Sequence, residues 1–283
     1  MNERRLYEVK QATIALLTER WEQNYLLNRG AIAAFPGVEK LFGRFAGIPA
    51  VLAGAGPSLD RNVHLLAVAR GLVPDIVVNL DPQLYTANFF EGVDTRNITL
   101  VAPTIVHPSL REQWKGPFFF YNKHAPDIPV LARIALNHPR VGALIPGGSV
   151  LSVAYDLAFK TGADPIAFIG QDLGYPSGNA YASGTHFDSF EAEEIIDQRG
   201  DVIVEERDLF GRALKTQKSM AVTKQWFGWA FATWQPEAKR RIFNCSEAGI
   251  LTNCPQMTFG EFASRFCRKG VNVAWSIKKA AKG

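Results

Sequence analysis

The chain has 283 residues, of which 47% are hydrophobic and 20% charged, a composition typical of a folded globular protein and unlike that of a disordered one. Its net charge of +4 comes from 31 basic against 27 acidic residues, and much of the excess lies near the C-terminus. No basic segment carries the interleaved aromatic residues that line a nucleic-acid groove, so we expect no nucleic-acid partner.

The three cysteines are odd in number and lack C-x-x-C spacing, so neither a disulfide framework nor a zinc site is predicted. We expect Cys245, Cys254 and Cys267 to be core thiols of a cytoplasmic protein. Residues 1–23 are interrupted by charges and contain no signal-peptide pattern, and no stretch is apolar for long enough to span a bilayer. The sequence therefore predicts a cytoplasmic location without a membrane span.

The first predicted element is a helix over residues 4–28, where apolar side chains recur at helical spacing. Asn28-Arg29-Gly30 follows it and suits a helix C-cap. We assign residues 1–46 to an N-terminal helical segment.

Short apolar runs then alternate with helical segments. Because runs that are apolar throughout suit strands covered on both faces, we predict parallel strands joined by helical crossovers. The fold class is α/β: a Rossmann-like, mainly parallel sheet with helices on both faces, plus the N-terminal helix. This domain is assigned to residues 47–268 and a basic tail to residues 269–283. The predicted strands are 50–53, 75–80, 98–102, 118–121, 142–145, 166–169 and 241–244.

Two of the crossover helices are well marked. Ser149 can cap a helix whose apolar stripe ends at Gly162. The run 218–234 is rich in Trp and Phe, and we interpret these rings as core packing rather than as a cofactor-stacking surface.

The first candidate for chemistry is the turn after the first strand, residues 54–60. Gly54 and Gly56 permit a tight turn and close ligand approach, and Ser58 can cap a helix whose N-terminus favours an anion. The dinucleotide pattern G-x-G-x-x-G fails because no third glycine follows, and the Walker pattern fails because no Gly-Lys-Ser/Thr follows. A nucleotide site that is neither the NAD pattern nor a P-loop is predicted, with an ordinary strand-end turn as the alternative.

The second candidate is the loop after residues 166–169, which begins Gly170-Gln171-Asp172 and continues into a polar, glycine-rich stretch. Since ligands of open α/β sheets lie outside the carboxyl ends of strands, this loop and the first turn are expected to share one edge. His186 in this loop is our candidate general base, because its unperturbed pKa lies near neutrality. A surface histidine is the alternative.

The third candidate follows the strand 241–244, where Asn244, Ser246 and Glu247 could contact a substrate. A plain turn is the alternative. No Asp-x-Asp pair of the kind that chelates a metal to a sugar nucleotide is evident, so no metal and no other cofactor is predicted.

Four segments carry a family resemblance. In chain order they are PAVLAGAGPSLD, GLVPDIVVNLDPQ, PGGSVLSVAYDLAFKTGADPIAFIGQDLGY and RIFNCSEAGI. Together they resemble the central domain of the bacterial motility-associated factor (Maf) glycosyltransferases, within a superfamily described as 6-hydroxymethylpterin diphosphokinase MptE-like. The resemblance covers most of residues 35–262. It extends to bacterial CMP-sialic-acid sialyltransferases, which share an A-G-N-G-P-S-L turn and a later S-G-I-D-F segment.

The resemblance implies transfer of a nonulosonic, sialic-acid-like sugar from its CMP-activated form to Ser or Thr of a protein such as flagellin, without a metal. The partners are then a nucleotide-sugar donor and flagellin or another surface protein. For this reaction our candidate catalytic residues are His186 and Asp172. The implied nucleotide-binding residues are Gly54, Ala55, Gly56, Pro57, Ser58, Asp81, Gly148, Ser149, Gly170, Gln171, Asp172 and Tyr175.

The chain departs from the family pattern in two places. Ala55 stands where the sialyltransferases have Asn, which removes one side-chain contact. One βα unit of about 20 to 30 residues is missing before Gly71-Leu72, where the family supplies another part of the nucleotide pocket. The alternatives are therefore a pterin diphosphokinase-like enzyme that uses ATP, and a non-catalytic nucleotide-binding remnant.

Overall fold

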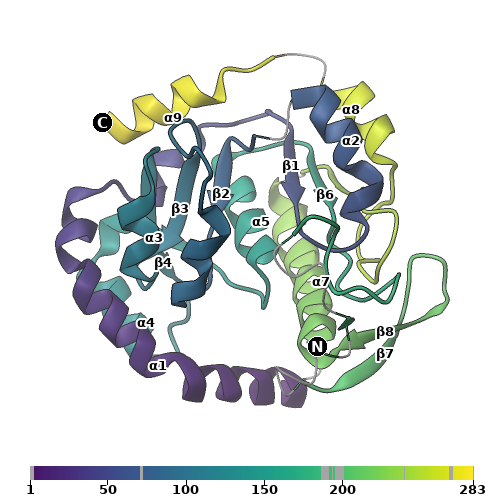
Figure 1. The fold of residues 1–283 in the computed structure, drawn as a ribbon, viewed down its shortest axis with the longest axis horizontal. Helices are drawn as coiled ribbons and strands as arrows, with labels where there is room; N and C mark the ends of the chain where they lie inside the picture. Colours follow the sequence, from purple (N-terminus) through teal and green to yellow (C-terminus); the bar gives the residue numbers. More distant parts are fainter. Residues whose placement is uncertain are drawn as a thin grey trace. The chain divides into compact units, whose positions relative to one another are not determined.

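The computed structural model describes residues 3–70, 73–185, 191–192, 194, 201–238, 240–267 and 270–282 (Figure 1). It divides into two compact units. The first unit comprises residues 1–6, 46–72 and 147–270, and the second comprises 7–45, 73–146 and 271–283. Both units are discontinuous in sequence. The division into residues 1–46, 47–268 and 269–283 that the sequence suggests remains a prediction.

The sheet of the first unit has three parallel strands in the order β1-β6-β9. They are β1 (Ala50–Ala53), β6 (Ile166–Ile169) and β9 (Ile242–Asn244). All three lie where apolar runs predicted strands, and β6 is buried along its whole length. The predicted parallel arrangement is confirmed.

Helices cover both faces of this sheet. On one face, α2 (Leu59–Arg70) and α8 (Phe259–Phe266) pack on the β6 side chains Ala167 and Ile169. On the other, Phe168 contacts Tyr155 of α5 (Val150–Thr161) and Phe227 of α7 (Lys218–Ala238). Because successive side chains of a strand point to opposite faces, three consecutive β6 residues meet both layers.

Trp226, Phe227 and Phe231 of α7 are buried, as predicted, whereas Trp229 is exposed. Tyr155 of α5 lies against Phe231 and stacks with Trp234, with ring centroids 5.3 Å and 5.6 Å apart. Helix α5 itself begins after Ser149 and ends at Gly162, which has a left-handed φ of 90°.

The sequence did not predict the hairpin of β7 (Ile203–Arg207) and β8 (Ala213–Gln217) in the first unit. Strand β7 alternates in exposure and β8 is buried only at its last two residues, so neither strand is buried throughout. No continuous apolar run therefore marks these two strands in the sequence.

The second unit has four parallel strands in the order β2-β3-β4-β5. They are β2 (Ile76–Val78), β3 (Thr99–Pro103), β4 (Phe118–Lys123) and β5 (Ala143–Leu144). Each contains part of a predicted strand. The strands predicted as one sheet thus form two, with β1 and β2 in different sheets among the described residues.

Helices α1 (Glu3–Ala34), α3 (Pro108–Gln113) and α4 (Pro129–Asn137) contribute to the core of this unit. Trp21 of α1 is fully buried with Leu100 and Phe120 of the sheet. Short 3-10 helices lie at η1 (Val38–Leu41), η2 (Leu84–Phe90) and η3 (Pro139–Val141). The last helix is α9 (Val273–Lys282), within the residues expected to form a tail.

Two local expectations were wrong. Helix α1 does not stop at Gly30, because Ile32, one turn from Asn28, packs into the same core and extends the helix to Ala34. Of the three cysteines, only Cys245 is buried, whereas Cys254 is partly exposed and Cys267 is exposed. None of the three lies within a helix or strand, so no periodic pattern marks which of them is buried. None of the described helices is long and apolar enough to cross a membrane.

Candidate functional site

Three strand-end loops meet at the carboxyl edge of the β1-β6-β9 sheet. Ala53 of β1 pairs with Ile169 of β6, and Phe168 of β6 pairs with Asn244 of β9. The three candidate loops of the sequence therefore start at one level of one sheet edge. This is where open α/β sheets bind ligands.

The first turn and the β6 loop are bonded through their backbones. The Gly54 amide donates to the Ile169 carbonyl at 2.9 Å, and the Gly56 amide donates to the Gly170 carbonyl at 3.0 Å. A Cβ on Gly56 would lie 2.6 Å from that carbonyl oxygen, closer than such atoms approach. The glycines of the predicted anion turn are thus needed for the packing of one loop on the other.

The carboxylate of Asp172, in the loop after β6, binds to the N-terminus of α2 through Ser58. It accepts the Ser58 amide at 2.8 Å and also the Ser58 hydroxyl. Both residues are buried, at 1% and 2% exposure. Burial raises the pKa of Asp172, although the two Ser58 hydrogen bonds and the charge of Arg61 oppose the rise. The amide expected to meet a ligand phosphate is therefore bonded to a carboxylate of the protein.

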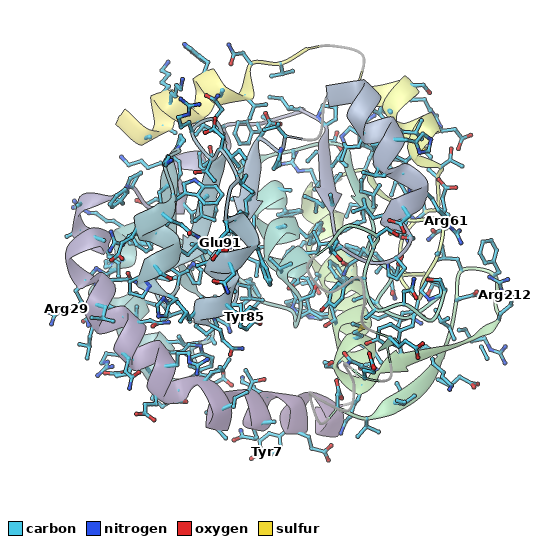
Figure 2. The ribbon with its side chains drawn as sticks, in the orientation of Figure 1. Tyr7, Arg29, Arg61, Tyr85, Glu91 and Arg212 are labelled. Atoms are coloured by element: carbon cyan, nitrogen blue, oxygen red, sulfur yellow. The ribbon has the colours of Figure 1, made fainter. Side chains whose placement is uncertain are left out.

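The loop after β9 fastens to the loop after β6. The Gln171 amide donates to the Ser246 hydroxyl at 3.0 Å, and the Ser246 amide donates to the Asn244 side-chain oxygen at 2.9 Å. The Glu247 carbonyl accepts from Arg61, labelled in Figure 2, at 2.8 Å. All three residues predicted after β9 thus join the cluster.

The N-terminus of α5 lies against the first turn and keeps free polar groups. A Cβ on Gly54 would be 2.7 Å from the Leu151 side chain, which places the first turn of α5 beside it. The Ser149 hydroxyl is buried without a hydrogen-bond partner and makes no capping bond. The Gln171 side-chain nitrogen is also buried and unpartnered. Gly148, with φ 102°, packs so closely on α7 that a Cβ would lie 2.4 Å from the Thr223 hydroxyl.

The loop beyond Asp172 folds back on the first turn. The Ala182 amide donates to the Ala55 carbonyl at 2.9 Å, and the Ser183 hydroxyl donates to Asp60 at 2.8 Å. Tyr175 is buried in this loop. His186 lies outside the described residues, so its role as base stays a prediction.

Asp81 belongs to the second unit, after β2. Its carboxylate accepts the Gln83 amide at 2.9 Å and the hydroxyl of Tyr85, labelled in Figure 2, at 2.5 Å. The predicted nucleotide contact of Asp81 therefore stays a prediction.

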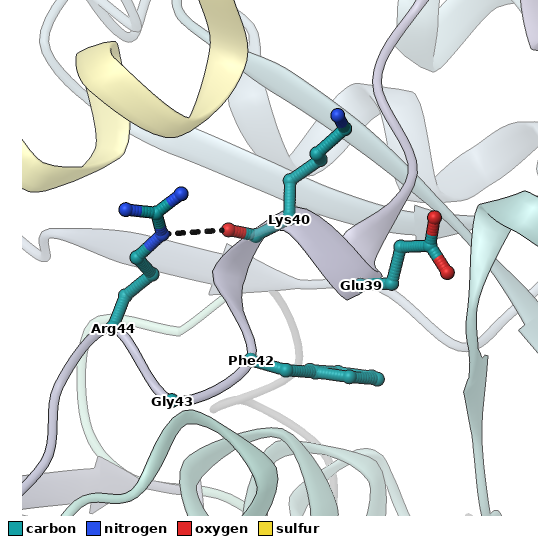
Figure 3. A pocket seen from close by; sticks show the side chains of 5 residues that line it. All are labelled: Glu39, Lys40, Phe42, Gly43 and Arg44. Carbon is teal, nitrogen blue, oxygen red and sulfur yellow. Dashed lines mark hydrogen bonds between the residues drawn. The ribbon is translucent and has the colours of Figure 1, made fainter. Parts of the chain in front are cut away.

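The second unit also carries an open surface hollow of about 520 Å³. Figure 3 shows its lining: Glu39, Lys40, Phe42, Gly43 and Arg44. Arg44 donates to the Lys40 carbonyl at 3.2 Å. The hollow contains none of the predicted site residues. Within the described ranges, no group of three or more His, Cys, Asp or Glu side chains is placed to hold a metal ion.

The sequence did not predict the contribution of Arg61 and Asn62, at the start of α2. Arg61 and Asn62 donate to the carbonyls of Glu247 and Cys245, at 2.8 Å and 3.0 Å. Their spacing after Ser58 is ordinary for helix residues, so no pattern marks them.

Comparison with known proteins supports the resemblance. Residues 67–178 match the family model described as 6-hydroxymethylpterin diphosphokinase MptE-like. The fold is similar to the solved Maf glycosyltransferase from Magnetospirillum magneticum AMB-1, with a TM-score of 0.56 and 18% sequence identity over 86% of this chain. The chain spans about 40% of that protein's length. No curated protein sequence matches the chain.

Proposed function

We propose that this chain is a glycosyltransferase that moves a nonulosonic sugar from a CMP-activated donor to Ser or Thr of a protein such as flagellin. The proposal begins from the fold, which is similar to that of a Maf glycosyltransferase. The donor and the acceptor come from the sequence resemblance, and the cytoplasmic location comes from the cysteine pattern and the N-terminal sequence.

The observation that carries the proposal is the N-terminus of α5 at the edge where three loops converge. Its Ser149 hydroxyl and the side-chain nitrogen of Gln171 are buried polar groups without partners. Unpaired buried groups of this kind cost free energy, so a ligand that bonds to them gains affinity. A helix N-terminus adds a preference for an anion such as the donor phosphate.

The described contacts divide the roles between two helices. Because the Ser58 amide is bonded to Asp172, the α2 N-terminus is not open to the phosphate. We therefore place the phosphate at α5 and give Asp172 the task of holding the first turn against the β6 loop. Breaking the bond between sugar and phosphate leaves a stable phosphate and a positively charged sugar ring, and a base must take the proton of the acceptor hydroxyl. His186 remains our candidate for that base.

Calorimetry tests donor binding. The full chain is titrated with CMP, CMP-sialic acid and ATP, each with and without magnesium. We expect CMP and CMP-sialic acid to bind without magnesium. Ser149→Ala should weaken CMP by about tenfold, the equivalent of one lost hydrogen bond to a charged group. Ser264→Ala, which removes a hydroxyl of α8 bonded to the Glu261 carbonyl, is the matched control and should bind as the parent does.

The second candidate function is a pterin diphosphokinase, because the family model bears that description. This enzyme would bind ATP and a reduced pterin with magnesium. Binding of that pair, with no binding of CMP ligands, would overturn the glycosyltransferase proposal. Binding of CMP with no transfer to any protein acceptor would favour a non-catalytic remnant instead.

A further inference from the structure

Lys123 ends strand β4 of the second unit and has no part in the function proposed above. Its ammonium nitrogen lies 4.9 Å from the ring centroid of Trp21, a residue that is fully buried. The lysine itself is partly exposed. Among the described residues it forms neither a hydrogen bond nor an ion pair, so its contact with the protein is with an aromatic face.

The charge of Lys123 is poorly compensated. Burial lowers the pKa of Lys123 to about 8. Among the described residues, the charge of Asp81 opposes this fall. Asp81 is bonded to Gln83 and Tyr85 and forms no ion pair with the lysine. At neutral pH most copies therefore carry an ammonium group without a bonded anion.

Unpaired acceptors lie at the ends of the same strands. Asn79 follows β2 and Asn122 precedes Lys123 in β4, and the side-chain oxygen of each is buried without a partner. The Tyr121 hydroxyl donates to the Asn79 backbone carbonyl at 2.8 Å and so ties the end of β2 to β4. The carboxyl edge of this sheet thus combines one free cation with oxygens that accept from hydroxyl groups.

We propose that Lys123 binds the anionic group of a small polyhydroxylated ligand, a carboxylate or a phosphate ester, at the carboxyl edge of the β2-β3-β4-β5 sheet. The ammonium group pairs with the anion, and a ligand hydroxyl group donates to the side-chain oxygen of Asn79. Such charge-assisted bonds are stronger than neutral ones, and the position is the usual ligand edge of a parallel sheet.

The observations for this proposal come from the second unit alone, whereas the donor phosphate is placed on the first unit. The test uses no nucleotide and no acceptor protein, so its failure leaves the glycosyltransferase proposal untouched. Equally, a chain that fails to bind CMP can still bind an anion at Lys123.

The experiment is calorimetry on the full chain with glucuronate, glucose 6-phosphate and glucose as probes. The first two separate a carboxylate from a phosphate, and glucose tests the need for charge. The variants are Lys123→Met, which removes the charge, and Lys123→Arg, which keeps it. Lys279→Met is the matched control, since Lys279 lies 5.1 Å from the Trp275 ring but is exposed on α9.

At pH 7 we expect at least one charged probe to bind the parent chain and Lys279→Met alike, with glucose at least about tenfold weaker. Lys123→Met should lose about tenfold in affinity and Lys123→Arg less than about threefold. At pH 9.5 the parent should lose affinity as its amine deprotonates, whereas Lys123→Arg should keep it because guanidinium stays charged.

The proposal is overturned if Lys123→Met binds the charged probes as tightly as the parent does. It is also overturned if glucose binds as tightly as the charged probes, or if neither charged probe binds. If Lys123→Met does not fold, the comparison of parent and Lys123→Arg at the two pH values decides. Affinity that does not change between pH 7 and pH 9.5 in the parent counts against Lys123.

Discussion

In each parallel sheet, hydrogen bonds fix the loops at the carboxyl edge, but different groups provide these bonds in the two sheets. At the β1-β6-β9 edge, loops bond to one another through Gly54, Gly56 and Gly170, and the buried carboxylate of Asp172 secures the turn. At the other edge, asparagines of α1 provide the bonds. Asn24 donates to the carbonyls of Pro82 and Ile105, and Asn28 to those of Thr104 and Val106.

The difference concerns which side chains each edge tolerates. The first edge depends on glycines, because their backbones approach within hydrogen-bond distance of one another and a Cβ would collide there. The second depends on two amides one helical turn apart, which reach over the ends of β2 and β3. Adding a side chain to a glycine should therefore destabilise the first edge, and shortening an asparagine should destabilise the second.

The largest effect is expected for Gly56→Ala. The new Cβ would lie 2.6 Å from the Gly170 carbonyl oxygen and 2.8 Å from an Asp172 oxygen, so the loops must separate. We expect a loss of about 3 kcal/mol in the free energy of unfolding, measured by urea denaturation. Gly30→Ala is the control, because no atom lies within 4 Å of its Cβ and α1 should gain about 1 kcal/mol. A loss of similar size at both positions would refute the close-approach explanation.

Asp172→Ala should cost about 2 kcal/mol, because it leaves the buried amide and hydroxyl of Ser58 without an acceptor. Asp172→Asn, which retains one acceptor oxygen, should cost less. Denaturation of both variants at pH 7 gives the comparison, and equal stability of Asp172→Ala and the parent contradicts the role of Asp172 in holding the turn.

The pH dependence of this contribution has a defined sign. Since the pKa of Asp172 is raised in the folded chain, the folded state binds a proton more readily than the unfolded state. Stability from this group is then present at low pH and is lost as pH rises from about 4 through the folded pKa. The stability of the parent relative to Asp172→Asn should fall over that window. A relative stability that rises there would reverse our assignment.

Asn24→Ala tests the second edge and should cost about 1.5 kcal/mol, since two buried carbonyls lose their donor. Gln23→Ala is its neighbour control: Gln23 is exposed and bonds only to Glu19 among the described residues, so its loss should be within about 0.5 kcal/mol. Equal effects at the two positions would show that α1 does not hold the strand ends through Asn24.

The smallest effect is expected for Arg61→Ala. Its bond to the Glu247 carbonyl is exposed, so its loss should cost about 0.5 kcal/mol in urea denaturation. A cost as large as that of Asp172→Ala would mean that the β9 loop, rather than the Asp172 carboxylate, secures the first turn.

The sequence predicted the strands because buried parallel strands are apolar throughout, and it placed the three site loops at the ends of β1, β6 and β9. It did not predict that the strands divide between two sheets, because that division depends on pairing between distant segments. The role of Asp172 was likewise hidden: an aspartate after a strand is equally suited to a ligand and to Ser58, 114 residues earlier in the chain. The free hydroxyl of Ser149 becomes visible only once its surroundings are known.

Hydrogen-deuterium exchange with and without CMP-sialic acid tests the central claim most directly, that the donor binds at the α5 N-terminus of the first unit. We predict slower exchange in peptides that cover residues 147–152 and 170–175, with no change in residues 36–45 around the surface hollow. Protection confined to the hollow, or absent from both site segments while the donor is bound, would contradict the claim.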